Sequence, residues 1–147
     1  MPPKCLIALK KFYFLVVLIT GGYELGNIES EIYDPLTKTS CMLPNITYNR
    51  AGHTQDGLLL CGGGDGLSAD DKTTLTCLTW SQGTWNVSHH LIFRRMNQVS
   101  WTPASGAGTY LMGGVFIEDV PSPRQKTEIV RPDGTVEQGF DLAARIK

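Results

Sequence analysis

The sequence predicts an all-β protein that is built from about three similar antiparallel sheets. The main observation is a repeated pattern, in which a short apolar run ends in two consecutive glycines. The three glycine pairs are Gly21-Gly22, Gly62-Gly63 and Gly113-Gly114. A polar loop follows each pair, and two further apolar or aromatic stretches follow each loop. Self-similarity over roughly 40 to 50 residues is typical of repeat architectures, so we expect each unit to form one small sheet.

The first unit is predicted to cover residues 12–50, after a separate N-terminal segment of residues 1–11. Its first strand is expected at Leu15–Thr20, directly before the first glycine pair. Two adjacent glycines permit positive φ angles and let another backbone approach closely. A second strand at Glu31-Ile32-Tyr33 leads into Asp34-Pro35-Leu36-Thr37, which is typical turn chemistry.

The second unit is expected at residues 51–95 and the third at residues 96–147. Trp80 and Trp85 flank a Ser-Gln-Gly turn in the second unit. Aromatic side chains of this size suit the layer between two stacked sheets, because each buries a large apolar area. Together these elements predict twisted four-stranded antiparallel sheets that form the blades of a β-propeller. A β-sandwich with glycine-rich turns is the alternative fold.

The order of these elements resembles the kelch repeat, in which two glycines are followed by a tyrosine, a tryptophan, Leu-Pro and Arg-x-x-His. The residues that carry this signature are Gly21, Gly22, Tyr33, Arg50, His53, Gly62, Gly63, Trp80, Trp85, Arg95, Gly113 and Gly114. The chain departs from the pattern at Ser40, which replaces the tryptophan, and at Val130 and Val136, which replace both aromatics. The resemblance covers roughly residues 12 to 142 and implies kelch-type blades. Since propellers close with about four to eight blades, about three blades imply an incomplete propeller.

The N-terminal region has two interpretations. Lysines precede the apolar run Phe12–Ile19, as in the charged region and hydrophobic core of a signal peptide. The same run leads directly into the first glycine pair, so it also fits the first strand of a blade. We favour the strand, because cleavage would remove it. The run is shorter than the roughly 20 apolar residues that a bilayer requires, so no membrane span is predicted.

Cysteines and glycosylation motifs favour a secreted or extracellular glycoprotein. Adjacent antiparallel strands bring Cα atoms within disulfide distance, which makes Cys61 and Cys77 the first candidate pair. Cys41 is the alternative partner of Cys61, or pairs with a cysteine outside the chain. Asn45 and Asn86 each begin an N-x-S/T acceptor motif. Free thiols in a cytoplasmic blade remain the alternative.

Composition and motifs exclude several kinds of chemistry. The net charge is −1, and the 13 Lys and Arg residues form no cluster that would neutralise a row of phosphates, so no nucleic-acid partner is expected. His89 and His90 are adjacent and would point to opposite faces of a strand. No Gly-x-Ser-x-Gly or Cys-x-x-Cys motif is present. We therefore expect no metal, no cofactor and no enzymatic activity. Galactose oxidase has a kelch-type propeller, but its copper ligands and crosslinked Tyr–Cys pair have no match here.

Recognition through loops is the remaining function, because loops on rigid scaffolds commonly carry binding sites. Phe116 and Ile117, after the third glycine pair, are the candidate binding loop, unless they pack onto their own blade. The sequence thus predicts a non-catalytic interaction module that binds a protein or glycan, with self-association through open blade faces as a further mode. The alternative is the substrate-recognition part of an intracellular kelch adaptor for a ubiquitin ligase. A fragment of a galactose-oxidase-like enzyme is the third interpretation.

Overall fold

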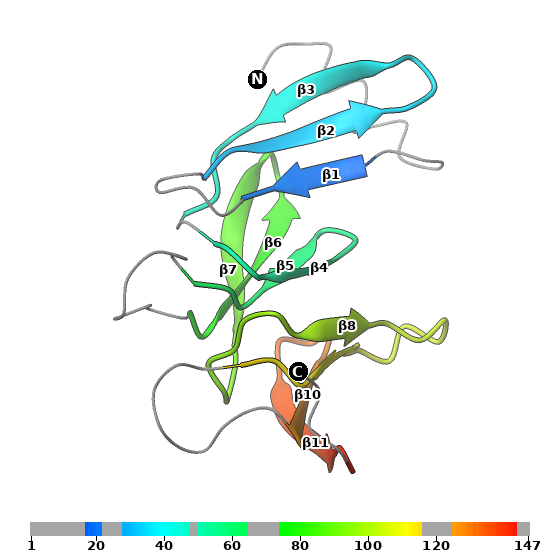
Figure 1. Cartoon of the computed structure of the whole chain (residues 1–147). Helices are drawn as coiled ribbons and strands as arrows, with labels where there is room; N and C mark the ends of the chain where they lie inside the picture. The colour runs from blue at the N-terminus through cyan, green and yellow to red at the C-terminus, as the bar shows by residue number, and fades with distance from the viewer. Residues whose placement is uncertain (1–16, 22–27, 48–49, 65–73, 116–124, 144–147) are drawn as a thin grey trace.

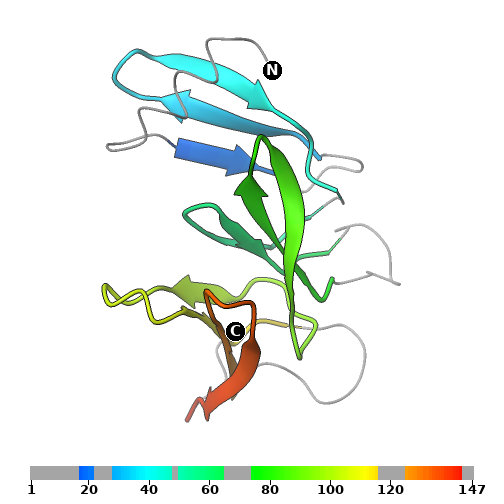
Figure 2. The same ribbon diagram turned by 180° about the vertical axis from the view of Figure 1, so that it is seen from behind.

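The computed structural model describes residues 17–21, 28–47, 50–64, 74–115 and 125–143. These residues form three antiparallel sheets of three or four strands and contain no α-helix, and therefore no helix that would cross a membrane. The sheets are stacked one below the other, with the first at the top of Figure 1 and the third at the bottom; Figure 2 shows the same stack from behind. The predicted all-β fold class of incomplete propeller-like blades is thereby confirmed.

The first sheet contains three described strands, which pair in the order of the chain. They are β1 (Val17–Thr20), β2 (Ser30–Asp34) and β3 (Thr39–Leu43). The β2–β3 turn begins where β2 ends, because the Asp34 carboxylate accepts a 2.9 Å hydrogen bond from the backbone N–H of Leu36. In the register of this sheet, Glu31 on the central strand lies opposite Ile19 on one side and Met42 on the other. These three side chains therefore share one face.

The second and third sheets each contain four consecutive strands. The second consists of β4 (Thr54–Asp56), β5 (Leu59–Cys61), β6 (Thr76–Ser81) and β7 (Thr84–His90). The third consists of β8 (Val99–Trp101), β9 (Thr109–Met112), β10 (Lys126–Val130) and β11 (Val136–Asp141). The glycine pairs follow β1, β5 and β9, and in each sheet the strand before the glycine loop pairs with the strand after it.

Two apolar layers hold the sheets together. The layer between the first and second sheets contains Ile32, Leu43, Ile46, Leu60, Leu78, Trp80 and Trp85. Trp80 and Trp85 meet edge to face with centroids 5.3 Å apart, and the Trp85 indole N–H donates a 3.1 Å hydrogen bond to Ser30 Oγ of the first sheet. The layer between the second and third sheets contains Cys61, Cys77, Leu91, Leu111 and Val130. Both tryptophans therefore lie between stacked sheets.

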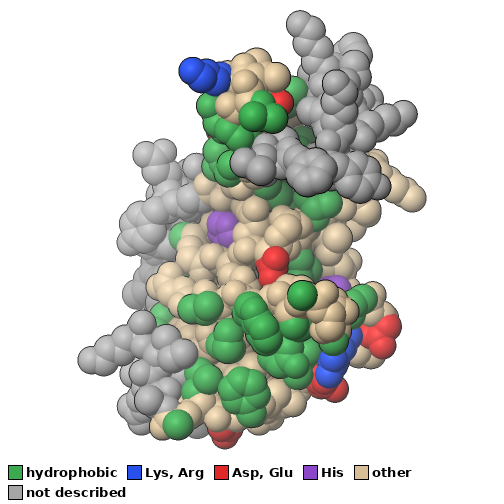
Figure 3. Space-filling model, turned by 90° about the vertical axis from the view of Figure 1, so that its right-hand side faces the viewer, with side chains coloured by type: hydrophobic (Ala, Val, Ile, Leu, Met, Phe, Trp, Pro, Cys, Tyr) green, Lys and Arg blue, Asp and Glu red, His purple; other side chains and the backbone are tan. Residues whose placement is uncertain are grey.

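Part of the apolar surface remains exposed on the third sheet. Figure 3 shows hydrophobic side chains gathered on the lower half of the side seen there. Val99, Trp101 and Phe140 are each at least half exposed, and the Trp101 ring lies 5.5 Å from that of Tyr110.

Candidate functional site

The first glycine of the first two pairs lies where two segments of backbone meet. Gly21 and Gly62 have φ angles of 62° and 66°. A Cβ at Gly21 would lie 2.7 Å from the Arg50 carbonyl oxygen, and one at Gly62 would lie 2.6 Å from the Arg95 carbonyl oxygen. Any side chain would therefore be strained twice, by the backbone conformation and by the contact. Gly22 lies outside the described residues.

A buried arginine crosses the glycine end of both four-stranded sheets. Arg50 donates from Nη1 to the carbonyl oxygens of Gly62 and Thr76, each at 2.8 Å, and from Nη2 to Thr76 Oγ1 at 2.6 Å. Arg95 donates from Nη1 to the carbonyl oxygens of Gly113 at 2.9 Å and Lys126 at 3.2 Å. Because Thr76 and Lys126 both begin the strand after the glycine loop, the two arginines occupy equivalent sites.

The two arginine sites differ in charge. Arg95 forms a 2.6 Å ion pair with Glu128, and both side chains are fully buried. The other carboxylate oxygen of Glu128 accepts hydrogen bonds from the backbone N–H groups of Ile92 and Phe93. Burial raises the pKa of Glu128, while the Arg95 charge and these hydrogen bonds oppose the rise. Burial likewise lowers the pKa of Arg95, opposed by Glu128. Leu78 stands at the equivalent position of the second sheet, opposite Leu60 as Glu128 is opposite Leu111.

His53 connects the second unit to the first sheet. Its Nδ1 donates to the Arg50 carbonyl oxygen at 2.9 Å, and its Nε2 lies 3.1 Å from Thr20 Oγ1 on β1. Burial is the main reason that the pKa of His53 is lowered. Gln98 makes the equivalent connection in the next unit, by donating to the Cys61 carbonyl oxygen at 2.8 Å. Sequence reasoning missed Gln98, although it follows Arg95 at the same spacing as His53 follows Arg50.

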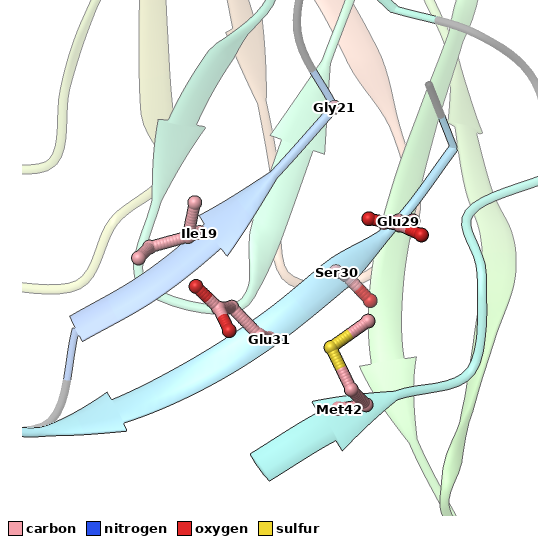
Figure 4. A pocket seen from close by; sticks show the side chains of 6 residues that line it. All are labelled: Ile19, Gly21, Glu29, Ser30, Glu31 and Met42. Carbon is pink, nitrogen blue, oxygen red and sulfur yellow. The ribbon is translucent and has the colours of Figure 1, made fainter. Parts of the chain in front are cut away.

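A pocket of about 170 Å³ opens on the face of the first sheet that carries Ile19, Glu31 and Met42. It is lined by Ile19, Gly21, Glu29, Ser30, Glu31 and Met42, and we call it the first-sheet pocket. Figure 4 shows its side chains coming from three adjacent strands, with the Glu29 and Glu31 carboxylates on β2 and its approach. Ile19 is 46% and Met42 53% exposed. The pocket is therefore lined both by apolar side chains and by carboxylates. Sequence reasoning did not find it.

A second pocket, of about 260 Å³, lies between the second and third sheets and includes Leu59, His89, Thr102 and Arg131. Both ring nitrogens of His89 are engaged there, with Ser88 Oγ at 2.8 Å and the Arg131 carbonyl oxygen at 2.9 Å. This histidine therefore has no ring nitrogen left to offer a ligand.

Cys61 and Cys77 form a disulfide across β5 and β6, with their Cα atoms 4.1 Å apart. Cys41 is also disulfide-bonded, so it does not pair with Cys61, and no described cysteine is a free thiol. Asn45 and Asn86 are both exposed. The candidate binding-loop residues Phe116 and Ile117 lie outside the described residues.

Copper, which galactose-oxidase-like enzymes use, does not fit the donor set described. Across the described ranges no three His, Cys, Asp or Glu side chains come close enough to hold a metal ion. The ring nitrogens of His53 and His89 already contact protein atoms. The described residues therefore do not supply a copper site.

Comparison with known proteins gives a match in structure only. No protein-family profile and no curated protein sequence matches the chain. Among solved structures, the chain is similar to a novel fungal alcohol oxidase with catalytic diversity among the AA5 family, in complex with copper. The TM-score is 0.66 with 15% sequence identity, over 88% of this chain and 30% of the oxidase chain. This likeness shows the fold, and the chain spans about 30% of the length of the protein it matches.

This match contradicts two expectations from the sequence. The chain was expected to be a non-catalytic interaction module, secreted or in an intracellular adaptor, and not to belong to an enzyme. One solved structure that it resembles is an alcohol oxidase, which points to the galactose-oxidase-like interpretation that the sequence placed third. The physical reason is that glycine pairs, tryptophans and framework arginines specify a blade, and the same blade supports both binding proteins and enzymes.

Proposed function

We propose that this chain forms blades of the propeller scaffold of an alcohol-oxidising enzyme that resembles the copper alcohol oxidases. One observation carries the proposal: a structural match to a copper-bound fungal alcohol oxidase over 88% of the chain. In this proposal, the described residues hold the blades in register. The copper ligands of the enzyme would then come from residues other than those described.

We further propose that the three sheets are kelch-type blades, with units near residues 12–50, 51–95 and 96–147. A hydrogen bond that recurs in all three sheets supports this assignment. The backbone N–H of Gly21, Gly62 and Gly113 donates to the carbonyl oxygen of Glu29, Thr76 and Lys126, at 3.0, 3.3 and 3.2 Å. The same link therefore closes the glycine loop in each unit.

A secreted glycoprotein is the proposed context. The Cys61–Cys77 disulfide supports an oxidising compartment, and the exposed side chains of Asn45 and Asn86 are accessible to glycosylation.

The test is to isolate the native protein with an antibody against this chain, load it with Cu(II), and measure oxygen consumption with a panel of alcohols. Oxidation of the alcohol to the carbonyl compound should consume oxygen and release hydrogen peroxide, and a chelator should abolish both. The isolated 147-residue chain is the control, and we expect it to be inactive. A native protein that is folded and copper-loaded, yet oxidises none of the alcohols, would contradict the proposal.

A further inference from the structure

The second pocket, between the second and third sheets, lies where this layer lacks the aromatic rings that fill the layer before it. Trp80 pairs with Trp85 across β6 and β7, and Val130 pairs with Val136 across β10 and β11 at the same place in the third sheet. Val130 lines the pocket of about 260 Å³. Because valine has a far smaller side chain than tryptophan, the two sheets meet there with space left between them.

The second sheet contributes to the pocket the same framework that the first sheet contributes to the tryptophan layer. Leu59 pairs with Thr79 across β5 and β6, as Leu18 pairs with Ile32 across β1 and β2. Ile32 belongs to the tryptophan layer and Leu18 packs against it, whereas Leu59 and Thr79 line the pocket. The pocket is therefore equivalent to the tryptophan site of the first layer, with the rings absent and an isoleucine replaced by a threonine.

The β8–β9 connection forms another wall of the pocket and has no side chain that could fill it. Gly106 and Gly108 line the pocket, and residues 104–107 are Ala, Ser, Gly and Ala. A Cβ at Gly106 would meet no atom within 4 Å. The space beside this connection is therefore open to a ligand.

The hydroxyl groups of the pocket can accept hydrogen bonds but have already donated their protons. Thr79 Oγ1 donates to Ser88 Oγ at 2.8 Å. Thr102 Oγ1 donates to the Asp56 carboxylate, so the 2.7 Å contact between Thr102 and Thr109 is a donation from Thr109. A hydroxyl oxygen has two lone pairs, and those that remain on Thr79 and Thr109 require a ligand with an N–H or O–H group.

The cationic and imidazole groups of the pocket are already engaged within the protein. The Arg131 guanidinium pairs with Glu137 and donates to the Ala107 carbonyl oxygen at 2.6 Å. Both ring nitrogens of His89 have protein partners. Since burial of an unpaired charge is costly, these contacts favour an uncharged ligand.

We infer that the second pocket is a binding site for a small uncharged aromatic molecule whose ring carries an N–H or O–H group, as in indole or phenol. The ring fills the space that tryptophans occupy in the first layer, and its donor binds Thr79 Oγ1 on β6. The first layer contains the same interaction, because the Trp85 N–H donates a 3.1 Å hydrogen bond to Ser30 Oγ on β2. The inference concerns two sheets that are both described, and it does not rest on the proposed oxidase role.

The experiment measures the binding of indole to the full chain by isothermal titration calorimetry. Benzofuran is the matched ligand, because it has the same ring shape and no hydrogen-bond donor. We expect saturable one-to-one binding of indole with a Kd of about 1 mM or lower. Benzofuran should bind about fivefold more weakly, because one hydrogen bond is lost. Absence of saturable indole binding by the folded chain, or equal affinity for the two ligands, would overturn the inference.

Two chain variants test the location of the site. Val130→Trp places a ring at the position equivalent to Trp80 and should abolish indole binding. Val99→Trp adds the same side chain at a half-exposed position on β8 and should leave binding unchanged. Indole binding of wild-type affinity by folded Val130→Trp would contradict the assignment of the ligand to this pocket.

Thr79→Val keeps the test decisive if Val130→Trp does not fold, because valine has nearly the shape of threonine and lacks the hydroxyl. We expect this variant to lower the affinity for indole to that for benzofuran, and to leave benzofuran binding unchanged. Unchanged indole affinity in folded Thr79→Val, or an equal loss for both ligands, would refute the role of the Thr79 hydroxyl and with it the inferred mode of binding.

Discussion

At the scale of single residues, the two buried arginines occupy equivalent sites but have different side chains as neighbours. Arg50 donates to Thr76 Oγ1, and Leu78 occupies the position that Glu128 has in the third sheet. Arg95 pairs with Glu128, and Lys126 occupies the position that Thr76 has in the second sheet. A buried guanidinium is costly unless it is paired or hydrogen-bonded. The second sheet supplies these acceptors with carbonyl and hydroxyl oxygens, and the third adds a carboxylate.

We expect Glu128→Leu to lower the free energy of unfolding by about 3 kcal/mol, because it leaves the Arg95 charge buried without its partner. Urea denaturation followed by tryptophan fluorescence measures this change. Adding Lys126→Thr reproduces the arrangement around Arg50 and should recover part of the loss. If Glu128→Leu alone is neutral, the ion pair contributes nothing to stability.

His53 makes stability depend on pH. Burial holds its pKa in the folded protein below the ordinary value, so the unfolded chain binds the proton more readily. The contribution of His53 is therefore fully present above pH about 6.5 and is lost as the pH falls toward the folded-state pKa. We expect the loss to be smaller in His53→Gln, which places at this position the residue type found at 98. Denaturant titrations from pH 7.5 to pH 5 measure the difference.

At the scale of elements, the glycine that follows β1 and the one that follows β5 set how closely the next connection approaches. Gly62→Ala would place a Cβ 2.6 Å from the Arg95 carbonyl oxygen, while Gly83, in the β6–β7 turn, has a φ of 82° but no atom within 4 Å of its Cβ position. Both variants pay about 1 to 2 kcal/mol for the left-handed backbone. We expect Gly62→Ala to lose clearly more than Gly83→Ala in thermal or urea unfolding. Equal losses would show that the backbone contact is unimportant.

The elements also show what the sequence can and cannot predict. Glycine pairs, the turn at Pro35 and the tryptophans act through local chemistry, so the strands they delimit could be placed from the sequence. Glu128 and Gln98 act through partners that are distant along the chain, and only the strand register brings them together. The first-sheet pocket was missed for the same reason, since its residues come from three different strands and meet only through the strand pairing. Function was misjudged because blade chemistry is common to proteins that bind and proteins that catalyse.

At the scale of the whole molecule, the disulfide is consistent with an oxidising compartment, and the two acceptor asparagines allow the proposed secreted context to be tested. We expect protein secreted from eukaryotic cells to contain a Cys61–Cys77 linked peptide before reduction, and glycan at Asn45 and Asn86 that an amidase removes. Peptide mass spectrometry measures both. Asn45→Gln and Asn86→Gln are the controls for each glycan. Reduced cysteines and bare asparagines in correctly secreted material would contradict the proposed compartment.

The different neighbours of Arg50 and Arg95 also mean that the sheets are not interchangeable. A sheet with leucine at the position of Glu128 would leave the buried Arg95 charge without its carboxylate partner. A sheet with glutamate at the position of Leu78 would place a carboxylate among the apolar side chains around Trp80. Each junction is thus better suited to its own neighbouring sheet than to the other one. In a chain of similar units, this one pair of positions therefore favours one order of the sheets over an exchange of sheets between molecules.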